Sequence, residues 1–484
     1  MATCRIWWVR RDLRLDDNPA LARAASGSDA MIPVFVAGDA DEGAWPLGGA
    51  QRWWLARSVK AHGAKLEALG SRLVVVEGDA AKVLSDLARK IGATEVVWSR
   101  RFDPAGLAAE RRVEEALDKI GVRWSGQLSN HLFDPEEIAT KEGRPYQVYT
   151  PFSRNCRARP APSKPRASPT ELPPAHGAPK GVSVDSLGLE PKIDWAGGLR
   201  EMWTPGEETA RARLALFAPG ALAQYPVGRD EPAADGTSLL SPHLAFGEVG
   251  IRRVWHTAAS RQSVEESVQK FHSELLWREF ATHVIFHFPK TDLAPLRPDY
   301  ARFPWRQDAK ALEAWKRGKT GYPLVDAGMR QLWHTGWMHN RVRMVVASFL
   351  VKHLLLPWQD GARWFWDTLV DADLANNSLG WQWAAGSGAD AAPYFRIFNP
   401  TSQAEKFDPK SEYIRRWVPE LAGCDAKSAR EPGGGGLLPG LGGRTGANST
   451  AEGGYPQPII DHAEARARAL AALSSVSRGR TPAT

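Results

Sequence analysis

The sequence predicts an α/β fold at the start of the chain, a doubly wound parallel sheet, followed by an all-α domain. Short apolar runs alternate with amphipathic stretches over the first ~130 residues, as in chains that form parallel sheets covered by helices. A Pro-rich region follows, and helical periodicity dominates after it. We therefore divide the chain into an α/β domain at 1–130, an interdomain connector at 131–205 and a helical domain at 206–484.

The apolar runs of the first domain are predicted to be buried strands, because each is short and bounded by polar or Gly-containing segments. They are 4–9, 31–38, 72–78, 95–101 and 122–128. The amphipathic stretches 50–69, 79–92 and 107–121 are predicted to be helices. No GxGxxG motif follows the first run, so a Rossmann dinucleotide site is not predicted.

The segment after the first domain is rich in proline. Residues 152–205 include the run CRARPAPSKPRASPTELPPAHGAPKG, which is predicted to contain neither a helix nor a central strand. Beyond them, 241–258 and 263–286 show helical periodicity. Residues 431–454 are predicted to be a Gly-rich flexible loop, and the basic Ser/Arg tail after it to be frayed.

Composition limits the class of protein. The net charge of +7 and pI near 9.3 are compatible with a polyanionic partner without establishing one. Cys4, Cys156 and Cys424 are far apart, which provides neither a disulfide framework nor a CxxC metal site and suits a reducing compartment. No apolar stretch approaches the ~18 residues of a membrane span, so we expect a cytoplasmic protein with no membrane partner.

Tryptophan is abundant. The chain has 21 Trp, many of them between Trp277 and Trp383. A Trp-rich helical core explains most of them, and stacking or electron-transfer sites are the functional alternative. In SELLWREF a helix would place Glu274, Trp277 and Arg278 on one face, although an amphipathic helix with an ordinary Glu–Arg pair also explains this segment.

A second polar and aromatic tract is GYPLVDAGMRQLWHTGWMHNRVRM. A helix there places Asn340 and Met344 on one face, flanked by Arg341 and Arg343. This face is too polar for a protein core and lies in a segment too rich in aromatic residues for an ordinary solvated surface. The segment therefore predicts a binding site.

Together these tracts resemble the photolyase/cryptochrome family, most strongly its bacterial cyclobutane pyrimidine dimer (CPD) photolyases. The resemblance is carried by WVRRDLRLDDNPAL, YTPF, GTSLLSPHLAFGEV, LLWREF, GYPLVDAGMRQLWHTGWMHNRVRM, DLANNSLGWQWAAGSGADAAPYFRIFNP and YPQPIIDH, in the order of the family. It implies a deoxyribodipyrimidine photo-lyase. Such an enzyme uses blue light and reduced FAD to transfer an electron to a flipped-out dimer in double-stranded DNA.

The resemblance also implies the residues of the FAD site. Asn377 would face flavin N5, Arg343 would pair with Asp371, and hydroxyls and amides of TSLLS would bind the diphosphate. The implied FAD-binding residues are Tyr225, Thr237, Ser238, Leu240, Ser241, Glu274, Arg343, Asp371, Asp373 and Asn377.

Further roles follow from the same resemblance. Trp381, Trp358 and Trp305 would form an electron-transfer chain from the protein surface to the flavin. The implied catalytic residues are Glu274, Asn340, Met344 and Asn377, and the implied residues for DNA and the lesion are Arg229, Trp277, Arg278, Arg341, Trp383 and Arg396. The small residues 384–392 would leave room for a flipped dinucleotide.

The type of lesion and the metal content are predicted from particular residues. Enzymes that repair (6-4) photoproducts resemble one another in having histidines at the positions of Asn340 and Met344, so cyclobutane repair is favoured. Three cysteines cannot ligate an iron–sulfur cluster of the four-thiolate type. His283 and His287 lack the Glu of HExxH and a third ligand, so no metal is expected.

The antenna chromophore stays open. Folate binders in the family have Asn-Glu where this chain has Ala105 and Gly106; deazaflavin binders agree at Arg52 and Asp103 but differ at Arg101 and at Ala245. We expect an antenna in the N-terminal domain, and a folate, a deazaflavin, another flavin and no chromophore at all stay open as alternatives.

Two alternatives to double-stranded DNA repair remain. A cryptochrome-like photoreceptor would usually carry a long C-terminal extension, and the chain ends soon after the family core. A DASH-type enzyme for single-stranded DNA would usually have altered cavity aromatics. We expect a monomer.

Overall fold

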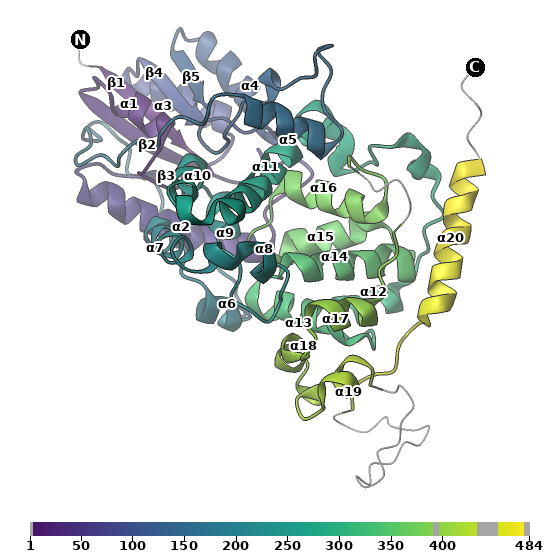
Figure 1. The fold of residues 1–484 in the computed structure, drawn as a ribbon. Coiled ribbons are helices and arrows are strands. Elements are labelled where there is room, and N and C mark those ends of the chain that lie inside the picture. Colours follow the sequence, from purple (N-terminus) through teal and green to yellow (C-terminus); the bar gives the residue numbers. More distant parts are fainter. Residues whose placement is uncertain (1–2, 391–395, 433–453, 479–484) are drawn as a thin grey trace. The chain divides into compact units, whose positions relative to one another are not determined.

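The computed structural model describes residues 3–390, 396–432 and 454–478, which form two compact units (Figure 1). Unit 1 comprises Met1–Pro226, Thr237–Asp292 and Trp366–Ser378, and unit 2 comprises Val227–Gly236, Leu293–Phe365 and Leu379–Thr484. This division by contacts differs from the predicted border at residue 205, because most of the chain between 206 and 292 packs with the sheet-containing unit.

Unit 1 contains a five-stranded parallel sheet. Its strands are β1 Cys4–Val9, β2 Ala30–Ala37, β3 Val74–Glu77, β4 Glu95–Ser99 and β5 Arg123–Gln127. They lie in the order β3-β2-β1-β4-β5, and each neighbouring pair is parallel. Strand order reverses beside β1, as it does in doubly wound sheets, so the predicted fold class is confirmed.

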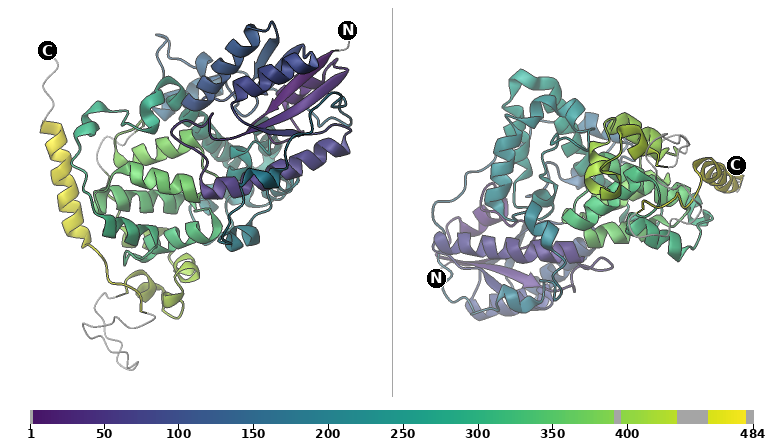
Figure 2. Two further views of the ribbon diagram at one scale, coloured as in Figure 1. Left: turned by 180° about the vertical axis from the view of Figure 1, so that it is seen from behind. Right: turned by 90° about the horizontal axis from the view of Figure 1, so that it is seen from below.

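Helices cover both faces of this sheet, with α3 and α4 side by side on one of them (Figures 1 and 2). The helices are α1 Pro19–Ala25, α2 Gly49–Ala68, α3 Ala80–Ile91 and α4 Pro104–Asp118. Trp8 of β1 joins an apolar cluster with Leu84 of α3 and Val113 of α4, whereas the ring of Trp7 lies 5.4 Å from that of His62 in α2. Consecutive strand residues therefore face opposite helical layers.

The rest of unit 1 consists of helices and irregular connecting segments. Its helices are α5 Tyr149–Ala158, α6 Gly197–Met202, α7 Glu207–Phe217, α8 Tyr225–Gly228, which ends in unit 2, α9 Ser241–Ala245, α10 Ile251–Ala259 and α11 Glu265–His287. Apolar side chains of α7, α10 and α11, among them Phe217, Val254 and Phe271, form one buried cluster. This cluster lies on the buried side of α11, which also carries the polar residues His272 and Glu279, whereas Glu274 and Trp277 are partly exposed.

The prediction that residues 152–205 contain no helix is wrong, since α5 extends to Ala158 and α6 lies before residue 205. Pro151 lies in the first turn of α5, where a missing backbone N–H is tolerated. Phe152 and Cys156 of the same helix are buried, and α5 packs on α11.

The irregular part of this connector lies along the sheet edge. The backbone N–H of Val182 donates to the carbonyl of Val75 in β3 at 2.8 Å, and that of Met31 in β2 donates to the carbonyl of Pro174 at 3.2 Å. β3 is an edge strand. The connector therefore pairs with backbone groups that an exposed edge would present to another chain.

Unit 2 is helical, and its described residues include no strand. Its helices are α12 Ala309–Lys316, α13 Pro323–Thr335, α14 Asn340–Ser348, a π-helical turn at Phe349–His353, α15 Trp358–Thr368, α16 Leu374–Ala385, α17 Pro400–Phe407, α18 Glu412–Trp417, α19 Ala426–Arg430 and α20 His462–Arg478. Trp315, Trp358 and Tyr413 are among its largest fully buried side chains. Residues 366–378, which include the end of α15 and the start of α16, belong to unit 1.

The expectation of a frayed tail after the Gly-rich segment is wrong, because α20 packs on unit 2 (Figure 1). Ala469 and Val476 of α20 join a cluster that includes Phe303 and Trp305. His353 Nε2 and His462 Nδ1 are 2.9 Å apart. Most of the Gly-rich segment, residues 433–453, lies outside the described residues.

Candidate active site

The first group of predicted residues lies on one face of α11. Glu274, Trp277 and Arg278 are each partly exposed. Glu274 Oε1 lies 3.5 Å from Lys270 Nζ, and Arg278 Nη1 donates to the carbonyl of Asn130 at 2.7 Å. The face thus combines an accessible carboxylate with an accessible indole, while the guanidinium is partly occupied by a backbone acceptor.

Trp277 has a ring partner that sequence reasoning missed. The ring of Tyr149, the first residue of α5, is stacked on it with centroids 3.8 Å apart and planes at 7°. The sequence signal for Tyr149 is the family segment YTPF, which contains no information about spatial neighbours.

Asn340 and Met344 lie on one side of α14, one turn apart. His339 caps the start of this helix, since its Nδ1 accepts from the backbone N–H of Arg341 at 3.2 Å. Burial, with the nearby guanidinium groups of Arg341 and Arg343, lowers the pKa of His339 to about 4. The imidazole is therefore neutral at pH 7 and can accept this bond.

Two of the predicted phosphate-binding cations share an acid that the sequence did not indicate. Arg341 Nη2 lies 2.6 Å from Asp230 Oδ1, and Arg229 Nη1 lies 3.5 Å from the same oxygen. The guanidinium of Arg341 also lies 4.3 Å from the ring centroid of Phe407. These three charges have a net value of +1, so Asp230 orients both cations and offsets part of their charge.

The segment from Thr237 to Ser241 has the backbone of an anion-binding loop. Leu239 has a left-handed φ of 52°, and Leu240 follows in the right-handed helical region with φ −89° and ψ −6°. Alternating hands of this kind can turn neighbouring backbone N–H groups toward one concave side. With the Thr237, Ser238 and Ser241 hydroxyls, the loop can supply several donors to a diphosphate.

The predicted flavin-contacting residues lie at the start of α16. Asp371 is buried, while Asp373 and Asn377 are partly exposed. Asp373 Oδ1 accepts from the backbone N–H of Asn376 at 2.9 Å and from its side-chain amide at 2.6 Å. One oxygen of Asp373 therefore organises the first helical turn, which presents Asn377. Arg343 Nε donates to the carbonyl of Met338 at 2.7 Å, and its pairing with Asp371 stays a prediction.

The three tryptophans of the predicted electron-transfer chain differ in burial. Trp381 and Trp358 are 2% and 1% exposed, whereas Trp305 is partly exposed. The indole of Trp381 packs edge-on against Phe365 at 5.0 Å and Trp315 at 6.1 Å between centroids. A route to the surface requires that its last indole be accessible, and Trp305 meets this requirement. The roles of the three indoles in electron transfer stay predictions.

The indole two residues after Trp381 has a different environment. Trp383 is partly exposed, with its ring centroid 6.4 Å from that of Phe398. Arg396 is exposed, and its carbonyl accepts from buried Lys352. Residues 391 and 392 of the predicted small-residue tract lie outside the described residues.

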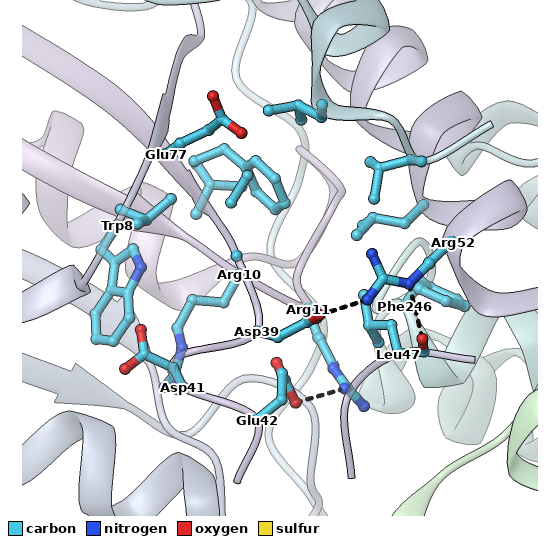
Figure 3. A pocket seen from close by; sticks show the side chains of 18 of the residues that line it. Trp8, Arg10, Arg11, Asp39, Asp41, Glu42, Leu47, Arg52, Glu77 and Phe246 are labelled. Carbon is cyan, nitrogen blue, oxygen red and sulfur yellow. Dashed lines mark hydrogen bonds and ion pairs between the residues drawn. The ribbon is translucent and has the colours of Figure 1, made fainter. Parts of the chain in front are cut away.

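A pocket opens in unit 1 at the carboxyl ends of β1, β2 and β3 (Figure 3). Its empty volume, open solvent included, is ≈ 890 Å³. Ligands of doubly wound sheets bind at this edge. The lining alternates apolar groups, such as Phe35, Leu47 and Phe246, with charged ones. We call it the strand-end pocket.

Ion pairs neutralise most charges around the strand-end pocket. Arg52 Nη2 lies 2.5 Å from Asp39 Oδ2, and Arg11 Nη2 lies 3.1 Å from Glu42 Oε2 (Figure 3). Burial raises the pKa of Asp41, although the nearby Arg112 guanidinium opposes the shift. A polar aromatic ligand would therefore meet fixed donors and acceptors within a mainly apolar wall.

Comparison with known proteins decides the family. Residues 5–173 match the family model for DNA photolyase, and residues 271–475 match that for the FAD binding domain of DNA photolyase. The chain is 47% identical over 481 residues to a deoxyribodipyrimidine photo-lyase of Agrobacterium fabrum, covering 98% of both chains. The chain belongs to the DNA photolyase family. The photolyase prediction made from the sequence is thereby confirmed.

Solved photolyase structures share this fold. A bacterial class III photolyase from Agrobacterium tumefaciens superposes with a TM-score of 0.93 and 46% identity, covering 99% of this chain and 98% of that one. An archaeal photolyase from Sulfolobus tokodaii with two FAD molecules superposes with a TM-score of 0.82 and 28% identity, covering 98% and 100%. The fold class of both parts of the chain is confirmed.

The residues of this photolyase fit an FAD. The loop from Thr237 to Ser241 can supply N–H and O–H donors to phosphate oxygens, while Asp371 supplies carboxylate acceptors. The side-chain amide of Asn377 can donate or accept, so it can face a ring nitrogen whether or not that nitrogen carries a proton.

The backbone of this photolyase disfavours the glutamate that the folate pattern has at residue 106. Asp103 caps α4, its Oδ1 accepting from the Gly106 N–H at 3.0 Å. A Cβ on Gly106 would lie 2.4 Å from the Cβ of Arg101, so a glutamate there requires a backbone shift. Arg101 itself is held by Asp103 at 2.8 Å and by Glu42 at 2.8 Å.

His283 and His287 of this photolyase take part in structural hydrogen bonds. His283 Nε2 accepts from the Tyr146 N–H at 3.0 Å, and His287 Nε2 lies 3.0 Å from the carbonyl of Pro135. The described residues contain no group of three or more His, Cys, Asp and Glu side chains arranged to hold a metal ion. Within those residues, no helix combines the length and apolarity of a membrane span.

Proposed function

We propose that this photolyase repairs cyclobutane pyrimidine dimers in double-stranded DNA under blue light. When bound, reduced FAD supplies, on excitation, the electron that opens the cyclobutane ring, and it recovers that electron afterwards. Four residues bind and orient the groups between which the electron passes: Glu274, Asn340, Met344 and Asn377. The folded chain has to hold the dimer, exclude water and stabilise the charge that arrives on it.

The observation that carries this proposal is the outward face of α11. Glu274 and Trp277 are both accessible there, in a chain similar over nearly its whole length to a photo-lyase. A carboxyl group can hydrogen-bond the carbonyl edge of a pyrimidine and stabilise charge that develops on it. An accessible indole can stack on a base for about 1–3 kcal/mol.

Flipping a damaged pair of bases out of the duplex costs little free energy. Extruding intact bases costs a few kcal/mol, and a dimer that already stacks poorly costs less. Stacking on Trp277 and Trp383 offsets that cost, so the site favours dimers over undamaged bases. Neither Asn340 nor Met344 can deliver a proton as a histidine does, and their presence supports cyclobutane over (6-4) repair.

The cations act on the DNA backbone. Arg229, Arg278, Arg341 and Arg396 supply a sequence-independent attraction to phosphates, which weakens as salt concentration rises. Asp230 orients two of them while it limits the local excess charge. The affinity for DNA in the dark should therefore depend on salt concentration, whereas the preference for the dimer over undamaged bases should depend on the indoles of Trp277 and Trp383.

Trp381, Trp358 and Trp305 serve a separate task, the delivery of electrons from the surface inward. Trp305 is more exposed than the other two indoles, which supports its place at the outer end of this route. Repair itself returns its electron, so the tryptophan route is needed only to restore the reduced cofactor.

The strand-end pocket is the proposed site of an antenna chromophore. Its position at the strand ends and its mixed apolar and charged lining suit a flat polar ring system. The Sulfolobus tokodaii photolyase with two FAD molecules supports a second chromophore in this family, whether folate, deazaflavin or flavin. Extraction of the purified protein, followed by absorption spectra of the released pigments, distinguishes these three.

The decisive experiment uses a double-stranded oligonucleotide with one cyclobutane thymine dimer, reduced protein, and blue light or darkness. We expect thymines to be restored only in the light. A matched oligonucleotide with a (6-4) photoproduct should remain unrepaired. Bound, photoreducible FAD with no restored thymines in any arm would refute the proposal and favour a cryptochrome-like photoreceptor that signals through a protein partner.

A further inference from the structure

We propose that Tyr149 is a positioning residue for the lesion site, because it holds the indole of Trp277 in one plane and leaves a single face for the flipped pyrimidines. This inference rests on the proposed function of Trp277. It gives a specific role to the YTPF segment, which the proposed function leaves without one.

The ring geometry carries the inference. The Tyr149 and Trp277 rings are nearly parallel at 7° with centroids 3.8 Å apart, so one face of the indole is covered. The buried ring of Phe280 lies edge-on to both, at 6.0 Å and 72° from Tyr149 and at 5.8 Å and 77° from Trp277. The indole is therefore supported on one face and along one edge.

The tyrosine hydroxyl anchors this support. Tyr149 Oη donates to the carbonyl of Ser273 at 2.8 Å, one turn before Trp277 in the same helix. Burial raises the pKa of Tyr149 to about 12, so the hydroxyl keeps its proton at any pH suited to DNA binding. Tyr149 belongs to α5, and its hydroxyl is hydrogen-bonded to α11. The position of its ring is therefore fixed by both helices.

By fixing the indole of Trp277, Tyr149 improves binding of the dimer without touching the DNA itself. A side chain that is ordered before binding avoids an ordering cost of about 0.5–1.5 kcal/mol, which corresponds to roughly 2- to 13-fold in affinity. The benefit applies only to a ligand that stacks on Trp277. We therefore expect the preference for dimer over undamaged DNA to fall, while phosphate-mediated binding stays constant.

The test compares three variants. Tyr149→Leu removes the stacked ring, Tyr149→Phe keeps the ring without the hydroxyl, and Phe152→Leu is the matched control. Phe152 packs on Phe280 and His283 in the same α5–α11 contact, so it reports general damage to that contact. Should Tyr149→Leu not fold, Tyr149→Met replaces it, since methionine fills irregular gaps.

The measured quantities are the dark Kd for an oligonucleotide with one cyclobutane dimer, the Kd for the undamaged oligonucleotide, and the repair yield at saturating DNA. The ratio of the two Kd values should shrink about 2- to 13-fold in Tyr149→Leu, shrink less in Tyr149→Phe than in Tyr149→Leu, and not change in Phe152→Leu. Repair yield of the bound dimer should be unchanged in all three.

Two results would overturn the inference: a full dimer preference in Tyr149→Leu, or an equal loss in Phe152→Leu. Failure of the proposed function looks different, because the unmodified protein would then show no preference for the dimer and no light-driven repair. That outcome would remove the role of Trp277 and that of Tyr149 with it.

Discussion

Gly361 of α15 lies directly against Trp381, the innermost indole of the proposed electron route. A Cβ at Gly361 would lie 2.1 Å from Cη2 and 2.5 Å from Cζ3 of Trp381, and 2.6 Å from Cδ2 of Leu350. Ordinary contact begins at 3.4 Å, so the substitution Gly361→Ala forces the buried ring to move by about 1 Å.

The magnitude follows from two opposing effects. Overpacking a dense core costs about 1–3 kcal/mol, and three simultaneous clashes with buried groups place Gly361→Ala near the upper end. Alanine is favoured over glycine within a helix by about 1 kcal/mol. The net loss is about 2 kcal/mol, which corresponds to a melting temperature lower by roughly 4–8 °C.

Gly380→Ala is the matched control, since Gly380 is exposed in α16 and a Cβ there meets no described atom within 4 Å. It should raise the melting temperature slightly and leave light-driven reduction of oxidised FAD unchanged. Gly361→Ala should lower both the melting temperature and the rate of photoreduction, as followed by thermal denaturation and flavin absorbance. A Gly361→Ala protein that melts at or above the unmodified protein would refute the packing argument.

Three further predictions concern single residues. Glu274→Ala should lower light-driven dimer repair several-fold while FAD content and dark DNA binding persist; an unchanged repair yield would exclude a role for Glu274 in the reaction. Trp305→Phe should abolish photoreduction of oxidised FAD but not repair by chemically reduced protein, and normal photoreduction would contradict the proposed route. Burial lowers the pKa of Lys352 from 10.5 to about 7. Between these two values the unfolded chain keeps a proton on this amine that the folded chain has lost. Unfolding experiments should therefore show the stability of the protein relative to Lys352→Met rising between pH 7 and 9, by up to about 1.4 kcal/mol per pH unit; a pH-independent difference would be evidence against a buried, titrating amine.

Much of the fold could be predicted because the relevant patterns are local. Strands β1 to β4 are short apolar runs, whereas the edge strand β5 is mostly polar, and the period of two in Trp7 and Trp8 agrees with layers on both faces. α20 was missed although Ala465, Ala469, Leu473 and Val476 recur at helical spacing, because alanine is a weak apolar signal and the basic composition suggested a solvated tail.

The site could be predicted only as a set of residues. The resemblance identifies Trp277 and Arg341, but their partners Tyr149 and Asp230 are 128 and 111 positions away in the chain. Neither partner has a pattern of its own that would indicate the contact. Such pairs depend on how helices pack, which no local period encodes.

The packing of α20 against Trp305 has a practical consequence for spectroscopy. Leu473 belongs to the same cluster as Trp305, while the next residue, Ser474, is exposed. A cysteine at position 474 would therefore carry a fluorophore or spin label on a rigid helix beside the outermost indole, without replacing any aromatic residue. Short-range quenching of such a label would record the arrival of oxidising equivalents at the protein surface in real time.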